Sequence, residues 1–134
     1  MSQMTLHHVS IVTTNLERSL AFYRDLFQLN LLQRPQFPSS GAWLDCGGLQ
    51  LHLVVNPAGT FRDNQRVDNN DGHFALRTND FEGFVKRAVE MGFKEDADVD
   101  DPSRLLVVRK GVAGFPQVYL LDPDRNIIEV NAVT

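Results

Sequence analysis

Cysteine is almost missing from this sequence, and long hydrophobic runs are missing altogether. The single cysteine, Cys46, has no partner for a disulfide within the chain, so the 134 residues must fold by burying apolar surface. No apolar run approaches the roughly 18 residues of a membrane span. The N-terminal MSQMTLHHVS also lacks the charged start and apolar core of a signal peptide. We therefore expect a cytoplasmic protein that has no membrane partner.

An excess of positive charge is missing as well. Thirteen lysines and arginines stand against 17 acidic residues, and they are scattered along the chain instead of forming a basic stripe. This distribution argues against a nucleic-acid partner. A hydrophobic content of 43% and a charged content of 22% are typical of an ordinary globular domain, for which a small molecule is the expected partner.

An internal repeat is the most informative pattern that is present. HVSIVTTNLERSL, which begins at His8, and HFALRTNDFEGFV, which begins 65 residues later at His73, share a histidine, a strand pattern, capping residues and a helix pattern. WLDCGGLQLHLVV can be laid over LLDPDRNIIEVNA in the same way, which places His52 opposite Glu129 at an offset of 77. Two copies of a βαβββ module are therefore predicted, which makes the fold class α+β.

The expected elements follow from periodicity and turn residues. We predict one domain, 1–134, with module one at about 5–56, a connecting loop at 57–71 and module two at about 72–132. The polar loop is interpreted as a linker or a mobile lid. Thr14 and Asn79 are the expected helix caps, because a glutamate stands three residues after each. The expected strands are 6–12, 29–33, 41–46, 49–55, 72–78, 104–110, 117–122 and 126–133, with helices at 14–27 and 79–92.

Alternation along the strands places four polar side chains on the face that points away from the helices. Because Val9 and Ile11 face the first helix, His8 must point the other way, and the same reasoning applies to the three residues His52, His73 and Glu129. A lone strand histidine is more often a core or surface residue. Four such residues at repeat-equivalent positions instead indicate one divalent metal ion, with Zn, Fe, Mn and Ni all suited to imidazole and carboxylate ligands.

Two further residues share this predicted face. Arg77 lies two residues after His73 and could bind a substrate carboxylate, although a solvated rim position is an equally good interpretation. Ser10 lies two residues after His8 and could hydrogen-bond to a substrate or to water.

The opening and closing segments resemble one known superfamily. LHHVSIVTTNLERSLAFYRDLF is similar to the start of the glyoxalase / bleomycin-resistance / extradiol-dioxygenase superfamily, and DPDRNIIEV is similar to its closing motif, DPDGN followed by a hydrophobic residue and Glu. The resemblance runs from about Leu6 to Val130. It implies the vicinal-oxygen-chelate fold, in which paired βαβββ modules form an open half-barrel around a divalent metal. It also implies a homodimer in many members, with metal ligands at His8, His73 and Glu129.

Two departures from the family pattern matter. Arg125 stands where the family turn has glycine, so either a side chain occupies a position that often needs a positive φ, at a cost of about 1 kcal/mol, or the chain uses a different turn. His52 stands where glyoxalase I has a Glu that takes part in moving the substrate proton, and where methylmalonyl-CoA epimerase has a Gln.

The resemblance implies an enzyme whose metal chelates two adjacent substrate oxygens. A lyase or isomerase is the expected class, with Glu129 or a metal-bound hydroxide as the catalytic base, and His52 is the expected fourth ligand. Two alternatives stay open. One is an extradiol-type dioxygenase that uses iron on His8, His73 and Glu129. The other is a non-catalytic protein that binds an antibiotic. Thiol transfer of the fosfomycin type is disfavoured, because the sequence ends five residues after Glu129 and has no room for the basic tail of those enzymes.

Overall fold

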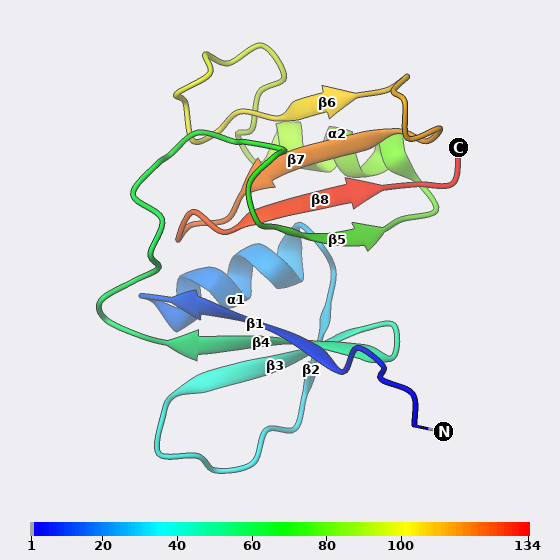
Figure 1. Ribbon diagram of the computed structural model, residues 1–134. Helices are drawn as coiled ribbons and strands as arrows, with labels where there is room; N and C mark the ends of the chain where they lie inside the picture. The colour runs from blue at the N-terminus through cyan, green and yellow to red at the C-terminus, as the bar shows by residue number, and fades with distance from the viewer. Residues whose placement is uncertain (1) are drawn as a thin grey trace. The chain divides into compact units, whose positions relative to one another are not determined.

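The chain folds into two compact units with the same architecture. A computed structural model describes residues 2–134, with one unit ending at Gly59 and the other formed by Thr60–Thr134. Each unit contains one four-stranded mixed sheet and one helix (Figure 1). The loop predicted at 57–71 belongs, from Thr60 onward, to the second unit.

The first unit has the predicted βαβββ order. Its sheet has the strand order β1-β4-β3-β2, with β1 parallel to β4 and the other neighbours antiparallel. Strands β3 and β4 match the predicted bounds, while the short strand near residue 30 covers three residues. The elements are β1 (His8–Thr13), α1 (Leu16–Asp25), β2 (Asn30–Leu32), β3 (Gly41–Cys46) and β4 (Leu49–Val55).

The second unit repeats this topology. Its strand order is β5-β8-β7-β6, again with one parallel pair, β5 and β8, and antiparallel neighbours elsewhere. The predicted pair of βαβββ modules and the α+β class are therefore confirmed. The elements are β5 (Phe74–Arg77), α2 (Phe81–Glu90), β6 (Leu106–Val108), β7 (Gln117–Leu121) and β8 (Ile127–Asn131).

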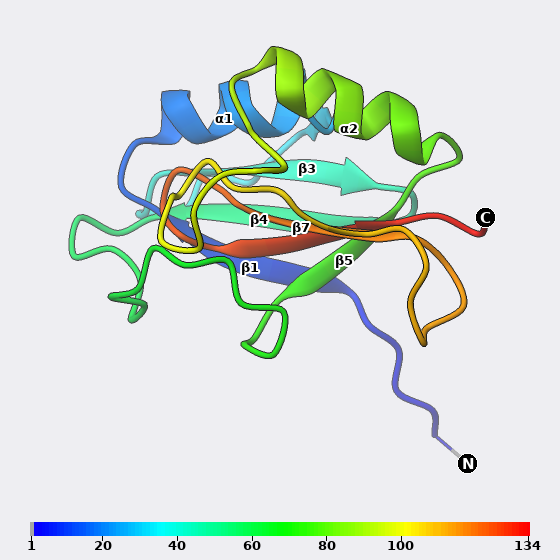
Figure 2. The same cartoon turned by 90° about the horizontal axis from the view of Figure 1, so that it is seen from above.

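Each helix lies across one face of the sheet in its own unit (Figure 2). In the first unit Tyr23 and Leu26 of the α1 segment are fully buried, together with Leu51 and Leu53 of β4. In the second unit the apolar side of α2 is buried in the same way. Burial of these apolar side chains stabilises each unit, at about 1.5 to 3 kcal/mol for each large residue. The polar residues of the same strands are left for the opposite face.

Both helices begin one residue later than the sequence pattern indicates. The caps are Asn15 and Asp80, whose side chains accept the N–H groups of Arg18 and Gly83, so the predicted caps Thr14 and Asn79 are wrong. The physical reason is that threonines two residues before the caps already turn the chain: Thr13 and Thr78 accept the N–H groups of Asn15 and Asp80.

The two hairpin turns differ in length, which changes the alignment of the repeats. Gly47 and Gly48 form the first turn, both with positive φ, as a tight hairpin requires. The DPDRN turn is longer, and Arg125 takes the positive φ, 67°, that was expected at the family's glycine position. As a result Trp43 pairs with His52 in the first unit, and Tyr119 pairs with Glu129 in the second. Tyr119 is therefore the structural equivalent of Trp43, whereas the ungapped sequence repeat aligns Trp43 with Leu120.

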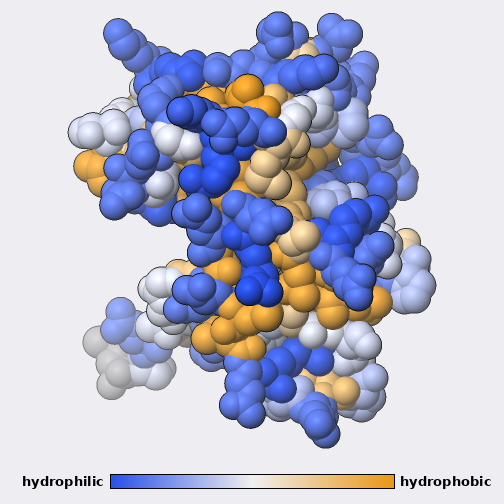
Figure 3. Space-filling view, turned by 180° about the vertical axis from the view of Figure 1, so that it is seen from behind, coloured by the Kyte–Doolittle hydropathy of each residue, from blue (hydrophilic) through white to orange (hydrophobic). Residues whose placement is uncertain are grey.

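The connecting loop is packed against its own unit. Val67 is 3% exposed and packs with Tyr119, Leu121 and Ile127, so the loop after Thr60 is anchored to the second unit at this residue. Hydrophilic residues cover most of the face drawn in Figure 3, with apolar residues showing between them. In the described part of the chain, no helix is long and apolar enough to cross a membrane.

Candidate functional site

The four predicted metal ligands lie in two pairs, one in each unit. Within residues 2–134, no three histidine, cysteine, aspartate or glutamate side chains form a group that could by itself hold a metal ion. The first unit contains the histidine stack, which we define as His8, His52 and Trp43. The second unit contains a group of polar side chains around Glu129, which we call the carboxylate cluster: His73, Gln117, Tyr119, Glu129 and Asn131.

In the histidine stack, the ring of His52 lies between two other rings. The imidazole of His8 is 4.0 Å away at an interplanar angle of 15°, and the indole of Trp43 is 4.2 Å away at 4°. The strand register explains the arrangement, because Ser10, His52 and Trp43 are paired across β1, β4 and β3. His52 is buried, whereas His8 is exposed and its Nδ1 lies 2.9 Å from that of His7.

This stack is not a chelating arrangement. Lone pairs of imidazole nitrogens lie in the ring plane, so two nearly parallel rings 4.0 Å apart cannot both point at one ion about 2.0 to 2.1 Å from each nitrogen. Nε2 of His52 also lies 2.7 Å from Oε1 of Gln50. Burial, followed by the nearby His8, His7 and Arg34, lowers the pKa of His52, so this ring is neutral at neutral pH.

Glu129 is the centre of the carboxylate cluster and is 7% exposed. Glu129 lies on β8, where it pairs in register with Ala75 of the neighbouring strand β5 and with Tyr119 of the neighbouring strand β7. Asn131 donates its Nδ2–H to Oε2 of Glu129 at 2.6 Å, and Gln117 donates to the hydroxyl of Tyr119 at 3.0 Å.

These donors keep the carboxylate of Glu129 charged in spite of its burial. Burial alone raises the pKa of Glu129, but hydrogen bonds from Asn131, Tyr119, Gln117 and His73 outweigh it and hold the pKa below its usual value. Burial and the hydrogen bond to Glu129 raise the pKa of Tyr119 to about 12, so its hydroxyl remains a donor at neutral pH.

His73 contacts Glu129 through its Nε2. Its Nδ1 lies 2.7 Å from the backbone carbonyl of Asp71, which can only accept, so Nδ1 carries the proton. Nε2 of the same ring lies 3.3 Å from Oε1 of Glu129; it accepts in the neutral ring and donates to the carboxylate in the protonated ring. That distance is long for a charge-assisted hydrogen bond, at about 2.7 to 2.9 Å. It equals the separation of two ligands of one tetrahedral ion, about 3.3 to 3.4 Å. The pair therefore fits a metal.

The two predicted substrate-binding residues lie on the expected strands. Arg77 donates from Nε to Oδ1 of Asn131 at 2.8 Å, and its guanidinium lies 4.7 Å from the ring centre of Phe115. Arg77 is thus joined to Glu129 through the amide of Asn131. Ser10 is exposed on β1 and is paired in register with His52.

The sequence patterns did not predict three residues of the carboxylate cluster, Gln117, Tyr119 and Asn131. Asn131 could have been found, because it stands two residues after Glu129 and alternation places it on the same face. Tyr119 and Gln117 were missed because the longer DPDRN turn shifts the repeat by one residue. Nothing in the local pattern indicated the role of the Asp71 carbonyl.

Comparison with known proteins decides the family. The model of the Glyoxalase/Bleomycin resistance protein/Dioxygenase superfamily matches residues 5–130. The chain belongs to this superfamily. The match covers both units and all four predicted ligands, which confirms the resemblance of the opening and closing segments.

Individual relatives within the superfamily are distant. Glyoxylase I 4 of Arabidopsis thaliana is 27% identical over 94% of this chain and 69% of its own length. Glutathione transferase FosA of Serratia marcescens is 24% identical over 95% of this chain and 79% of its own length.

A solved structure shows the shared fold. A variant of the fosfomycin resistance protein FosX of Listeria monocytogenes, complexed with Mn(II) and 1S,2S-dihydroxypropylphosphonic acid, has a TM-score of 0.73. It is 16% identical, and the comparison covers 100% of this chain and 95% of that one.

Proposed function

We propose that this chain is a metal-dependent lyase or isomerase that acts on a small substrate with two adjacent oxygens. The observation that carries the metal proposal is the 3.3 Å separation of Nε2 of His73 and Oε1 of Glu129, which matches that of two ligands on one tetrahedral ion. A divalent cation held by these two atoms would act as a Lewis acid on the substrate oxygens.

The proposed ligands are His8, His73 and Glu129. His73 and Glu129 fit the ion in their present positions. His8 is exposed on β1, so its ring can turn toward an ion if it gives up its stacking contact with His52. Support also comes from the FosX complex, in which a protein of the same fold is recorded with Mn(II) and a molecule that carries two adjacent hydroxyls.

For His52 we propose a role in proton transfer, with ligation as the alternative. As a ligand, His52 would have to leave the space between His8 and Trp43 and give up its contact with Gln50. As a base it can stay where it is. With Gln50 Oε1 accepting from Nε2, the free lone pair is on Nδ1, and the lowered pKa of His52 keeps the ring neutral.

This assignment changes the role proposed for Glu129. The sequence indicated Glu129 as a ligand, with Glu129 or a metal-bound hydroxide as the base. Three side-chain donors besides His73 stabilise the charged form of Glu129 and so weaken it as a base. We therefore propose that Glu129 holds the metal, while Arg77 and Ser10 bind the substrate. A substrate with an anionic group suits Arg77, since Nε is already used by Asn131 and the terminal nitrogens can form a pair with a carboxylate.

The test measures exchange of a substrate C–H proton and consumption of dioxygen in the same sample. Protein reconstituted with Mn, Zn, Fe or Ni is incubated in D2O with small hydroxy-carbonyl compounds and with catechols. We expect exchange of a substrate C–H proton for deuterium and no consumption of dioxygen. His52→Gln should slow the exchange about 100-fold or more, the usual contribution of a general base, and leave the metal content unchanged. Loss of metal in this variant would instead make His52 a ligand.

Two other outcomes would replace the proposal. Metal-dependent oxygen uptake with ring opening, especially if it survives His52→Ala, would make the chain a dioxygenase. Tight binding of bleomycin by metal-free protein, without any turnover, would make it an antibiotic-binding member of the superfamily.

A further inference from the structure

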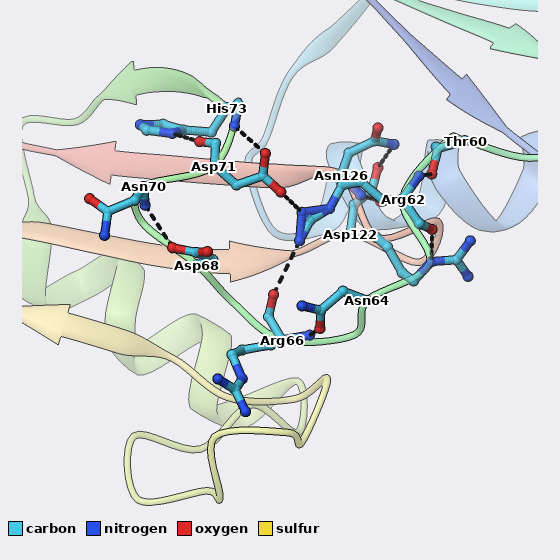
Figure 4. A network of polar contacts seen from close by, with 12 residues as sticks. Thr60, Arg62, Asn64, Arg66, Asp68, Asn70, Asp71, His73, Asp122 and Asn126 are labelled. Carbon is cyan, nitrogen blue, oxygen red and sulfur yellow. Dashed lines mark hydrogen bonds and ion pairs between the residues drawn. The ribbon is translucent and has the colours of Figure 1, made fainter.

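Arg62 is the central contact of the loop that leads to His73. Its Nη1 bonds to Oδ2 of Asp71 at 2.7 Å, and its Nη2 donates to the backbone carbonyl of Arg66 at 3.2 Å (Figure 4). The side chain is only 17% exposed. Burial of a guanidinium is costly unless it is paired, so these contacts hold Arg62 in one position.

Arg125 holds the same residue from the other side. Its Nε donates to the backbone carbonyl of Arg62 at 2.8 Å. This is the position at which the family turn has glycine, and it has a φ of 67°, where a side chain is unfavourable. The hydrogen bond to Arg62 therefore explains why arginine stands at this position, although glycine would adopt the positive φ with less backbone strain.

Asp71 connects this arrangement to the imidazole. Its Oδ2 is bound by Arg62, its Oδ1 accepts the N–H of Gly72 at 2.7 Å, and its backbone carbonyl lies 2.7 Å from Nδ1 of His73. Val67, buried in the middle of the loop, fixes the loop to β7 and β8. The position of the Asp71 carbonyl thus depends on the two arginines.

We propose that Arg125, Arg62 and Asp71 form a clamp that holds His73 in the tautomer with its proton on Nδ1. Without the clamp the ring is free to carry its proton on Nε2, and Nε2–H would then donate to Glu129 as an ordinary hydrogen bond. The lone pair that the proposed metal needs would be lost. Arg62 and Arg125 are in this sense positioning residues. The consequence for metal binding rests on the proposed function, but the clamp itself is a property of the metal-free protein.

The experiment measures the tautomer and the metal affinity separately. Nitrogen-15 NMR of metal-free protein reports which ring nitrogen of His73 carries the proton, and calorimetric titration with Mn²⁺ reports the affinity. Arg62→Gln should convert the single Nδ1–H form into a mixture and weaken Mn²⁺ binding about tenfold or more, as is usual for residues that orient a metal ligand. Arg66→Gln is the matched control, because it removes a charge from the same loop but leaves the Arg66 carbonyl in place.

Arg125→Gly separates positioning from stability. This variant restores the family residue and relieves the positive φ, so its melting temperature should not fall, while the His73 tautomer becomes mixed and Mn²⁺ binding weakens. If Arg62→Gln does not fold, Asp71→Asn tests the same contact with a neutral side chain. The clamp is wrong if the folded variants keep the Nδ1–H form seen in the unmodified chain. If the tautomer shifts but the unmodified chain binds no metal ion, the clamp stands and the proposed function fails.

Discussion

Glu129 shows how the surroundings of one residue select its role. Burial without partners raises the pKa of a carboxyl group, which makes its ionised form a stronger base and harder to keep charged as a ligand. Here Asn131, Tyr119 and Gln117 supply hydrogen bonds that reverse this tendency and hold the pKa of Glu129 below its usual value. The same carboxylate becomes a weak base and a good ligand, which is the role we propose.

The first prediction concerns this carboxylate. Glu129→Gln removes the charge and keeps the size, and Asn131 can still donate to the amide oxygen. We expect the variant to remain folded and to lose Mn²⁺ and Zn²⁺ binding, because the ion loses its one anionic ligand. Elemental analysis after reconstitution measures the metal content, and circular dichroism measures the fold.

Glu90→Gln is the control for this prediction. Glu90 is an exposed glutamate at the end of α2, so its replacement also removes one negative charge but no proposed ligand. It should bind metal as the unmodified chain does. Retention of about one ion per chain by Glu129→Gln would contradict the proposed ligand set.

At the scale of elements, the two helices show how closely the units repeat each other. Both α1 and α2 have ten residues, and both are preceded by a threonine whose hydroxyl accepts the N–H of the cap residue. In both helices the side chain of the cap accepts the backbone N–H of the residue three positions later. In the second unit Gly83 lies directly against the cap, because a Cβ at this position would lie 2.1 Å from Oδ2 of Asp80. The start of α2 therefore depends on Asp80 and Gly83 together.

The second prediction tests the cap. Asp80→Ala leaves the Gly83 N–H without its acceptor and should lower the free energy of unfolding by about 1 kcal/mol. Asn79→Ala, which changes the residue that the sequence pattern indicated as the cap, should change stability by less than about 0.5 kcal/mol, as is usual for a surface substitution. Denaturant unfolding measures both. Equal losses would show that the cap is not at Asp80.

At the scale of the whole molecule, the proposed metal site needs ligands from both units. His8 belongs to the first unit, and His73 and Glu129 belong to the second. Members of the superfamily are often dimers, as the resemblance implied. A homodimer is therefore the expected state of this protein.

The third prediction concerns this assembly. Light scattering at micromolar concentration, with metal bound, should give about twice the chain mass of 15.1 kDa, or 30.2 kDa. Mixing His8→Ala with Glu129→Ala protein then shows which units meet. Recovery of part of the metal binding means that ligands come from two chains, while no recovery in a dimer means that each chain completes its own site. A monomer that binds metal would contradict the expected dimer.

Sequence alone determined the features that depend on short-range regularity. The repeat, the order of elements, the bounds of β3 and β4, and the faces of His8 and Glu129 all follow from alternation with a period of two and from helical spacing. The positive φ at Arg125 follows from a turn motif. These features are properties of a few consecutive residues, so a local pattern is enough to reveal them.

Only the tertiary structure decided which side chains meet. The stacking of His52 between His8 and Trp43, and the meeting of Tyr119 with Glu129, depend on strand register. In the second unit the longer turn between β7 and β8 shifts this register by one residue relative to the repeat. The tautomer of His73 depends on a carbonyl held by arginines elsewhere in the second unit. Contacts between residues far apart in the chain follow from packing, which no pattern along one strand contains.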